Sequence, residues 1–156
     1  ELVGGVLSAG PDRLEAAGNH GIPQVIAPGA LDMVNFGPPD TVPEKFKTRQ
    51  FYQHNPTITL MRTTVNENAE LGIIMAQKLS RAKGPTTMII PQQGVSAIDA
   101  EGQPFDSPEA RSAWIENFKE NVAPNVTVIE MDNNINDDAF ATRLAETLLE
   151  SLKHDV

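Results

Sequence analysis

Apolar and polar positions along the chain fall into two patterns, which are short apolar runs and longer stretches with helical spacing. The short runs predict five strands. Most of them lack the strict alternation of a strand with one wet face, so we expect strands that are buried on both faces. The five runs are residues 2–7, 24–27, 57–61, 86–90 and 126–131.

Three longer stretches predict helices with clear start signals. Thr64 and Glu67 have the spacing of a capping box. Ser107 and Pro108 combine an N-cap residue with a first-turn proline. The predicted helices span about 64–83, 107–122 and 136–152, and a shorter fourth helix is expected over 11–18.

The last of these helices has a continuous apolar stripe. Its spacing of three and four residues is typical of a helix that packs one side against a core. We therefore expect the stripe to be buried; it consists of Ala141, Leu144, Ala145, Leu148, Leu149 and Leu152.

The order of these elements indicates the fold class. Strands that alternate with helices are typical of an α/β protein with right-handed crossovers. The sequence therefore predicts one α/β domain over residues 1–156, with a three-layer Rossmann-like sheet of about five mainly parallel strands flanked by helices. Two connections, 28–56 and 91–107, are longer than such a fold needs, and long connections are often functional.

Polar and small residues follow each predicted strand. In an open parallel sheet, ligands bind beyond the carboxyl ends of the strands, so these residues are expected to share one rim. The long insert would add residues that close over the ligand. The candidate ligand-binding residues are Gly29, Asp32, Asn35, His54, Asn55, Arg62, Thr63, Thr64, Gln92, Gln93, Gly94 and Ser96.

Arg62, Thr63 and Thr64 form the sharpest candidate for binding an anion. A guanidinium and two hydroxyls precede a helix N-terminus, whose free amides favour negative charge. The alternative is structural, with Thr64 as the helix cap and Arg62 paired with a surface acid.

Ser96 is a candidate nucleophile for a hydrolase. It does not lie in a nucleophile elbow, because Ala97 and Ile98 follow where a second glycine is required. A triad would need His20 or His54 as the base, with Asp32, Asp99 or Asp132 to orient it. A turn or hydrogen-bonding role for Ser96 is the simpler interpretation.

Composition excludes several classes of function. The chain has 21 acidic and 12 basic residues, and its net charge of −9 disfavours nucleic acid and anionic membranes as partners. It has no cysteine, which excludes disulfides and thiolate metal sites. Its few histidines lack zinc spacing, so no metal site is predicted. Neither a phosphate loop nor a dinucleotide fingerprint is present.

Three blocks of the sequence resemble a known family. The first is GIPQV at 21–25 with PGALDMVNFG at 28–37, and the second is HNP at 54–56 with TLMRTT at 59–64. The third is PQQGVSAID at 91–99 with GQPFD at 102–106. Together they are similar to the C-terminal half of the Tm-one-like ATP-binding domain proteins. The resemblance implies a longer protein of two α/β subdomains that is cytoplasmic and homo-oligomeric and binds ATP, with Mg²⁺ as a further candidate.

The residues and the resemblance together favour one function over two alternatives. We expect the chain to bind a nucleotide or a small phosphorylated or acidic metabolite. The site would lie at the carboxyl edge of the sheet or in the cleft with the missing N-terminal half. One alternative is a hydrolase or lyase that acts on a small acid or phosphate ester through Ser96 or His54. The other is a module for dimerisation or protein interaction.

Overall fold

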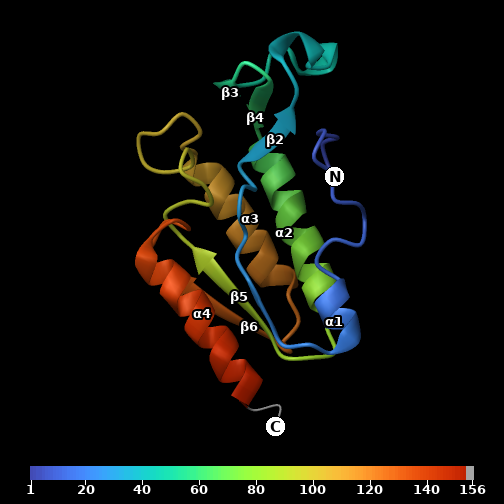
Figure 1. Cartoon of the computed structure of the whole chain (residues 1–156), viewed down its shortest axis with the longest axis vertical. Coiled ribbons are helices and arrows are strands. Elements are labelled where there is room, and N and C mark those ends of the chain that lie inside the picture. Colours follow the sequence, from blue (N-terminus) through green and yellow to red (C-terminus); the bar gives the residue numbers. More distant parts are fainter. Residues whose placement is uncertain (154–156) are drawn as a thin grey trace.

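The structure is a computed structural model that describes residues 1–153, and it contains two small sheets. The first sheet is parallel, with strand order β1-β5-β6. Its strands are β1 (Gln24–Ile26), β5 (Thr86–Pro91) and β6 (Val126–Met131). β5 is the central strand, and every one of its residues is buried. Figure 1 shows β5 next to β6. A continuous apolar run is what a central parallel strand requires.

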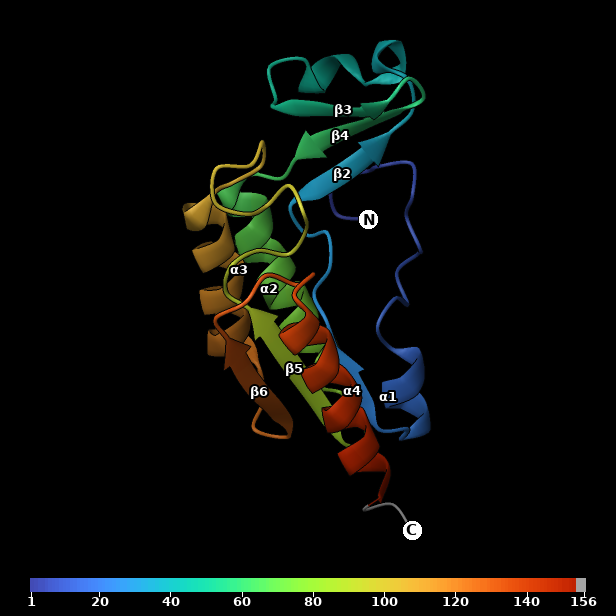
Figure 2. The same ribbon diagram turned by 60° about the vertical axis from the view of Figure 1, so that its left-hand side comes forward.

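Helices cover both faces of this sheet and produce the expected three layers (Figure 2). α2 (Val65–Leu79) and α3 (Pro108–Asn121) pack together on one face. α4 (Asp138–Lys153) lies on the other face, against β1 and β5. The α/β class and the three long helices are confirmed, including the Thr64–Glu67 capping box at the start of α2.

The main core lies between the parallel sheet and the α2–α3 pair. Trp114 and Phe118 of α3 meet Met88 of β5 there, and all three are fully buried. Gly72 allows the two helices to approach closely, because a Cβ at this position would lie 2.4 Å from the Trp114 carbonyl oxygen.

The second sheet is antiparallel, with strand order β2-β4-β3. It consists of β2 (Met33–Phe36), β3 (Phe51–Asn55) and β4 (Ile58–Arg62). Two short 3₁₀ helices, Pro39–Thr41 and Glu44–Phe46, connect β2 to β3. This sheet has a smaller core of Phe36, Phe46 and Met61. Figure 2 shows it beyond the end toward which β5 and β6 point, so it lies over the predicted rim.

The prediction of about five parallel strands was wrong in number. The parallel sheet has three strands, because β4 pairs in antiparallel fashion with β2 and β3. Both partners come from the insert 28–56, which lies between β1 and β4 and supplies short strands of its own. Sequence spacing could not identify this partner choice.

Residues 2–7 do not form the predicted first strand. Gly4 has φ +92°, a left-handed conformation that interrupts an extended chain. A single backbone hydrogen bond, from Val6 N to Asn35 O at 2.9 Å, joins this segment to β2. The segment therefore runs along the surface, with Val6 and Leu7 exposed.

Two helix predictions also need correction. The first helix is α1 (Ala16–His20), shorter and later than residues 11–18. In α4 the buried side chains are Phe140 and Thr147, whereas much of the predicted stripe lies in solvent. The helix packs on a face about a quarter of a turn away from the stripe. The exposed members are Ala141, Ala145, Leu149 and Leu152, and Leu144 and Leu148 are half-buried.

Within residues 1–153, none of the helices combines the length and the apolar character that a membrane span requires.

Candidate functional site

The carboxyl ends of β5 and β6 continue as paired loops. Gln92 N donates to Met131 O and Gln93 N donates to Asn133 O, each at 2.9 Å. The amide groups of the two glutamines also donate to acids, Gln92 to Glu130 at 2.9 Å and Gln93 to Asp132 at 2.5 Å. These bonds use the side-chain nitrogens. No described residue donates to the side-chain oxygen of either glutamine.

A tight turn follows at 94–99. Gly94 has φ +123°, and a Cβ there would lie 1.7 Å from Asp99 O, so the turn requires glycine. Ser96 Oγ accepts hydrogen bonds from the backbone N–H of Ile98 at 3.2 Å and of Asp99 at 3.1 Å. The polar side chain of Ser96 therefore serves in part to form hydrogen bonds within the turn.

Ser96 also connects the turn to the second sheet. Its hydroxyl donates to Asp32 Oδ2 at 2.7 Å. Asp32 is fully buried, and its other carboxyl oxygen has no hydrogen-bond partner among the described residues. Burial raises the pKa of Asp32 to about 6; the Ser96 hydrogen bond opposes this rise, and the nearby charge of Asp99 adds to it.

Arg62 is buried at the end of β4 rather than exposed at a rim. Its Nη2 contacts Asp99 Oδ1 at 3.1 Å, and its Nη1 donates to Asp32 O at 3.2 Å and to Thr63 Oγ1 at 3.0 Å. Only 6% of the residue is exposed. The guanidinium therefore joins the antiparallel sheet to the turn that contains Asp99.

The two threonines that follow Arg62 are also engaged within the chain. Thr63 Oγ1 donates to Leu31 O at 2.7 Å and accepts from Asn68 Nδ2 at 2.8 Å. Thr64 caps α2 through reciprocal bonds with Glu67. The structural alternative for Thr64 is thus confirmed, whereas the partner of Arg62 is a buried acid.

Asp99 is shared by a second arginine, Arg111 of α3. Arg111 Nη1 contacts Asp99 Oδ1 at 3.0 Å and Asp106 Oδ1 at 2.9 Å. Its Nε and Nη2 make no hydrogen bond with any described residue. Neither atom is among the fully buried polar atoms without a partner, so each retains some exposed surface, although only 9% of the residue is exposed. The Nε–Nη2 edge can donate two parallel hydrogen bonds to a carboxylate or phosphate.

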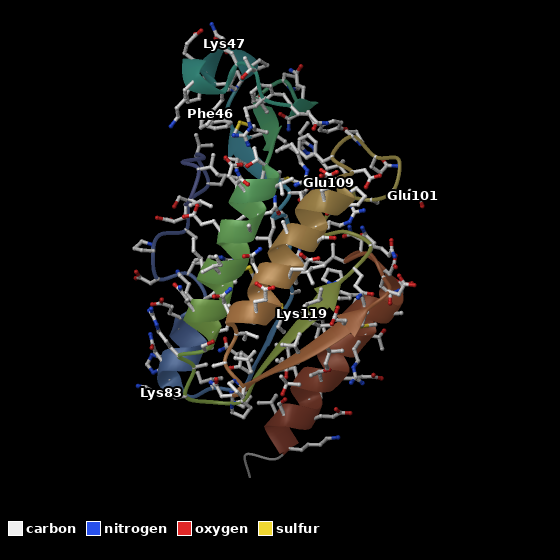
Figure 3. All side chains as sticks on the ribbon, turned by 180° about the vertical axis from the view of Figure 1, so that it is seen from behind. Phe46, Lys47, Lys83, Glu101, Glu109 and Lys119 are labelled. Atoms are coloured by element: carbon white, nitrogen blue, oxygen red, sulfur yellow. The ribbon has the colours of Figure 1, made fainter. Side chains whose placement is uncertain are left out.

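Arg111 lines a polar cavity of about 460 Å³ beside the carboxyl end of β5. Figure 3 shows Glu101, in the loop before α3, on the same side of the molecule as Glu109 in the first turn of that helix. The cavity is bounded by an arginine, two amides, a hydroxyl, acids and a few apolar atoms. Its lining residues are Gln92, Gln93, Glu101, Asp106, Pro108, Arg111, Ser112 and Ile115.

The predicted site residues therefore divide into separate groups. Asp32, Arg62, Gly94 and Ser96 meet in the buried network around Asp99. Thr63 joins this network through Arg62 and also lines a cavity of about 140 Å³ together with Asn35. The others lie elsewhere: Gln92 and Gln93 line the 460 Å³ cavity, and Gly29 lines a cavity of about 470 Å³ beside α2.

His20, His54 and Asn55, which were candidates for catalysis or for closure over the ligand, lie apart from this network. His54 and Asn55 are exposed at the end of β3 next to its hairpin turn, whereas Arg62 is at the opposite end of β4. His20 ends α1, before the amino end of β1. The Ser96 hydroxyl donates to Asp32 and accepts from backbone amides, and within residues 1–153 it forms no hydrogen bond with a histidine.

Sequence reasoning missed Arg111, although one signal was present. Arg111 is the fourth residue of α3, where the positive end of the helix dipole disfavours a cation. A cation in that position needs acidic partners, and Asp99 and Asp106 supply them.

Among the described residues, no three His, Cys, Asp or Glu side chains gather as they would around a metal ion.

Comparisons with known proteins identify a family whose members this chain resembles in sequence. The family described as "Uncharacterised protein family (UPF0261) C-terminal domain" matches residues 1–152. A UPF0261 protein of Clostridium tetani is 56% identical over 154 residues, which cover 98% of the chain and 38% of that protein. A UPF0261 protein of Rhizobium meliloti is 44% identical over 142 residues, which cover 90% of the chain and 36% of that protein.

The plant namesake of the Tm-one-like family is also similar. The ToMV resistance protein Tm-1 of Solanum lycopersicum is 40% identical over 151 residues, which cover 96% of the chain and 20% of the tomato protein. The resemblance seen in the sequence is thus confirmed. The chain spans under two fifths of the length of these bacterial relatives.

Proposed function

This chain belongs to the UPF0261 C-terminal domain family, and we propose that it binds a nucleotide or a small phosphorylated or carboxylated metabolite. The ligand would occupy the cavity of about 460 Å³ at the carboxyl edge of the parallel sheet. The observation that carries the proposal is the free Nε–Nη2 edge of Arg111 in that cavity. This moves the anion-binding role from Arg62, which is engaged with Asp99, to its neighbour across the shared carboxylate.

The location agrees with the way α/β folds bind ligands, which is beyond the carboxyl ends of parallel strands. The volume also falls within the roughly 300–1,000 Å³ of typical small-molecule sites. Gln92 and Gln93, two of the residues predicted from the sequence, form the wall on the β5 side.

The lining groups are complementary to a ligand that carries both an anion and hydroxyl or amino groups. Arg111 offers two N–H donors, and Gln92 and Gln93 offer free amide oxygens because their nitrogens already bond acids of the β6 side. Ser112 adds a hydroxyl, and Glu101 adds a carboxylate. A sugar phosphate or nucleotide presents such a combination of acceptors and donors.

The charge of Arg111 is largely offset by Asp99 and Asp106, so attraction at long range is weak. Selectivity would come from the directed hydrogen bonds that the Nε–Nη2 edge of Arg111 donates. This geometry suits planar or tetrahedral oxyanions. If ATP binds with Mg²⁺, the phosphates would supply most of the metal ligands, because Asp106 already bonds Arg111 and the Gly102 amide.

A binding assay tests this proposal. We expect ATP, with and without Mg²⁺, or simple sugar phosphates to raise the melting temperature of the chain and to give saturable heats in calorimetric titration. Arg111→Lys keeps a cation for Asp99 but loses the two-pronged edge. Because charged hydrogen bonds contribute roughly 1.5–3 kcal/mol, we expect affinity to fall by about tenfold or more.

Lys83→Gln is the control, because Lys83 is an exposed cation that does not line the cavity. Ser112→Trp, at an exposed cavity position, should block binding without touching Arg111. Equal affinities of Arg111→Lys and the unmodified chain would contradict the proposal. Binding seen only in a full-length bacterial relative would move the site out of this domain.

A second candidate function is self-association through α4. Leu149 and Leu152 are exposed on this helix, beside Ala141 and Ala145, which are small enough for close helix approach. Two antiparallel copies of α4 would place Asp138 of one next to Lys153 of the other at both ends. Light scattering should then show a dimer that Leu149→Glu converts to a monomer, whereas Ile22→Glu, which changes another exposed apolar residue, should not.

A further inference from the structure

A second cavity, of about 470 Å³, lies between the N-terminal segment 1–15, the carboxyl end of β1 and one side of α2. It shares no lining residue with the Arg111 cavity. In Figure 2 the N-terminal segment runs alongside the body of the molecule, separated from the α3 side by α2 and the parallel sheet. The two cavities are therefore independent sites, and a ligand of one does not contact the other.

The walls of this second cavity are mostly apolar. Ile26 and Pro28 come from β1 and the residues after it, and Leu71, Ile74 and Met75 come from α2. Ile74 and Leu71 are only half-buried in the folded chain, so their apolar surface is available to a molecule in the cavity. A hydrocarbon body would gain roughly 25 cal/mol per Å² of apolar surface removed from water.

Two cations also line the cavity. Lys78 Nζ donates to the carbonyl oxygens of Pro11 and, at 2.9 Å, of Arg13, which ties the N-terminal segment to α2. The Arg13 side chain is exposed and forms no hydrogen bond or ion pair with any described residue. The single acid in the lining, Glu1, accepts a hydrogen bond from Ser8. The charged groups in the lining are thus two cations and one acid, in a chain whose net charge is −9.

We propose that this cavity binds a small amphipathic acid, with a hydrocarbon body against Ile74 and Met75 and a carboxylate or similar anion at Arg13 and Lys78. An uncharged apolar molecule would leave Arg13 with solvent as its partner and would not use the remaining N–H of Lys78. A highly polar anion would leave the apolar walls wet. Only a molecule that has both parts matches the whole lining. This inference does not depend on the Arg111 site or on nucleotide binding.

Calorimetric titration with sodium octanoate, and with octanol as its uncharged counterpart, tests the proposal. We expect octanoate to bind saturably at one site and more tightly than octanol. Ile74→Trp, which places a large ring in the cavity, should weaken octanoate by more than about tenfold through lost volume. Arg13→Gln should weaken octanoate by about two- to fivefold, as expected for an exposed cation, and leave octanol unchanged.

Lys83→Gln is the control, since this exposed lysine near the end of α2 lines neither cavity (Figure 3). Arg111→Lys should not change octanoate binding, which separates this result from a failure of the nucleotide proposal. Thermal unfolding verifies that each variant is folded. Absence of saturable octanoate binding would overturn the inference. So would octanoate affinities in Ile74→Trp and Arg13→Gln equal to that of the unmodified chain.

Discussion

The two sheets of this molecule are stabilised in different ways. The parallel sheet is covered on both faces, and its central strand β5 meets large apolar side chains such as Trp114 and Phe118. The antiparallel sheet has a core of only three buried residues. It is joined to the rest of the chain by a buried network of charges, in which Asp99 lies between Arg62 and Arg111.

This difference shows where specificity and stability come from. Apolar burial is non-directional and supplies most of the folding free energy. A buried ion pair adds little net stability, because desolvation offsets the attraction, but its geometry fixes one arrangement and removing one partner is costly. The same network also holds Arg111 at the candidate site, so the position of the second sheet and the shape of the cavity are coupled.

The largest expected effect comes from breaking the main core. Trp114→Ala removes a fully buried indole from between α2 and α3 and should lower the free energy of unfolding by roughly 3–5 kcal/mol. Urea denaturation measures the change. Both sheets should lose stability together, because α2 packs against α3 in the main core and directly follows strand β4 of the antiparallel sheet. A loss confined to one sheet would show that the two regions unfold independently.

Asp99→Asn breaks the network between the regions. It leaves two buried guanidinium groups without a charged partner at this position, and breaking a buried pair typically costs roughly 3–5 kcal/mol. Hydrogen exchange should show faster exchange at β4 amides than at β5 amides. Uniform acceleration across both sheets would contradict the view that the charges serve mainly the antiparallel sheet.

Asp32 should give the network a distinctive pH dependence. Its pKa rises from 3.8 to about 6 on folding, so between these values the folded chain retains a proton that the unfolded chain releases. The contribution of Asp32 to stability therefore declines as pH rises from about 4 to 6, by up to roughly 3 kcal/mol, and stays low above that range. Asp32→Asn, whose amide oxygen can still accept from Ser96, should remove this decline.

The measurement is the difference in unfolding free energy between Asp32→Asn and the unmodified chain at several pH values. We expect the variant to gain relative stability as pH rises from 4 to 7. A difference that is constant with pH would mean that Asp32 titrates alike in the folded and unfolded states.

The smallest expected effect concerns an exposed pair in the antiparallel region. Lys47 contacts Glu44 at the surface, near Phe46, where both side chains are largely in solvent (Figure 3). Lys47→Ala should change the unfolding free energy by less than about 0.5 kcal/mol. Comparison with Asp99→Asn in the same assay would isolate the effect of burial on an ion pair. A loss above about 1 kcal/mol would show that this surface pair is not typical.

The candidate site was only partly predictable. Gln92 and Gln93, which line the proposed cavity, were among the candidates because they follow a buried strand, and that position depends on local sequence alone. Arg62 was assigned to a ligand because sequence does not reveal that Asp99, 37 residues later, reaches it. Arg111 was missed because its role depends on which of its nitrogens its partners leave free.

The sequence by itself determined the α/β class, the caps of α2 and α3, the positions of α2, α3 and α4, the three parallel strands and the family. These features follow from capping residues, apolar periodicity and motifs, which act over a few neighbouring residues. Only the tertiary structure decided that β4 pairs with strands of the insert and that Arg62 is buried. It also decided that α4 packs on the core through a face next to its apolar stripe and not through the stripe itself. Pairing, burial and helix rotation are settled by competition among distant segments for the same partners, and a single sequence does not display that competition.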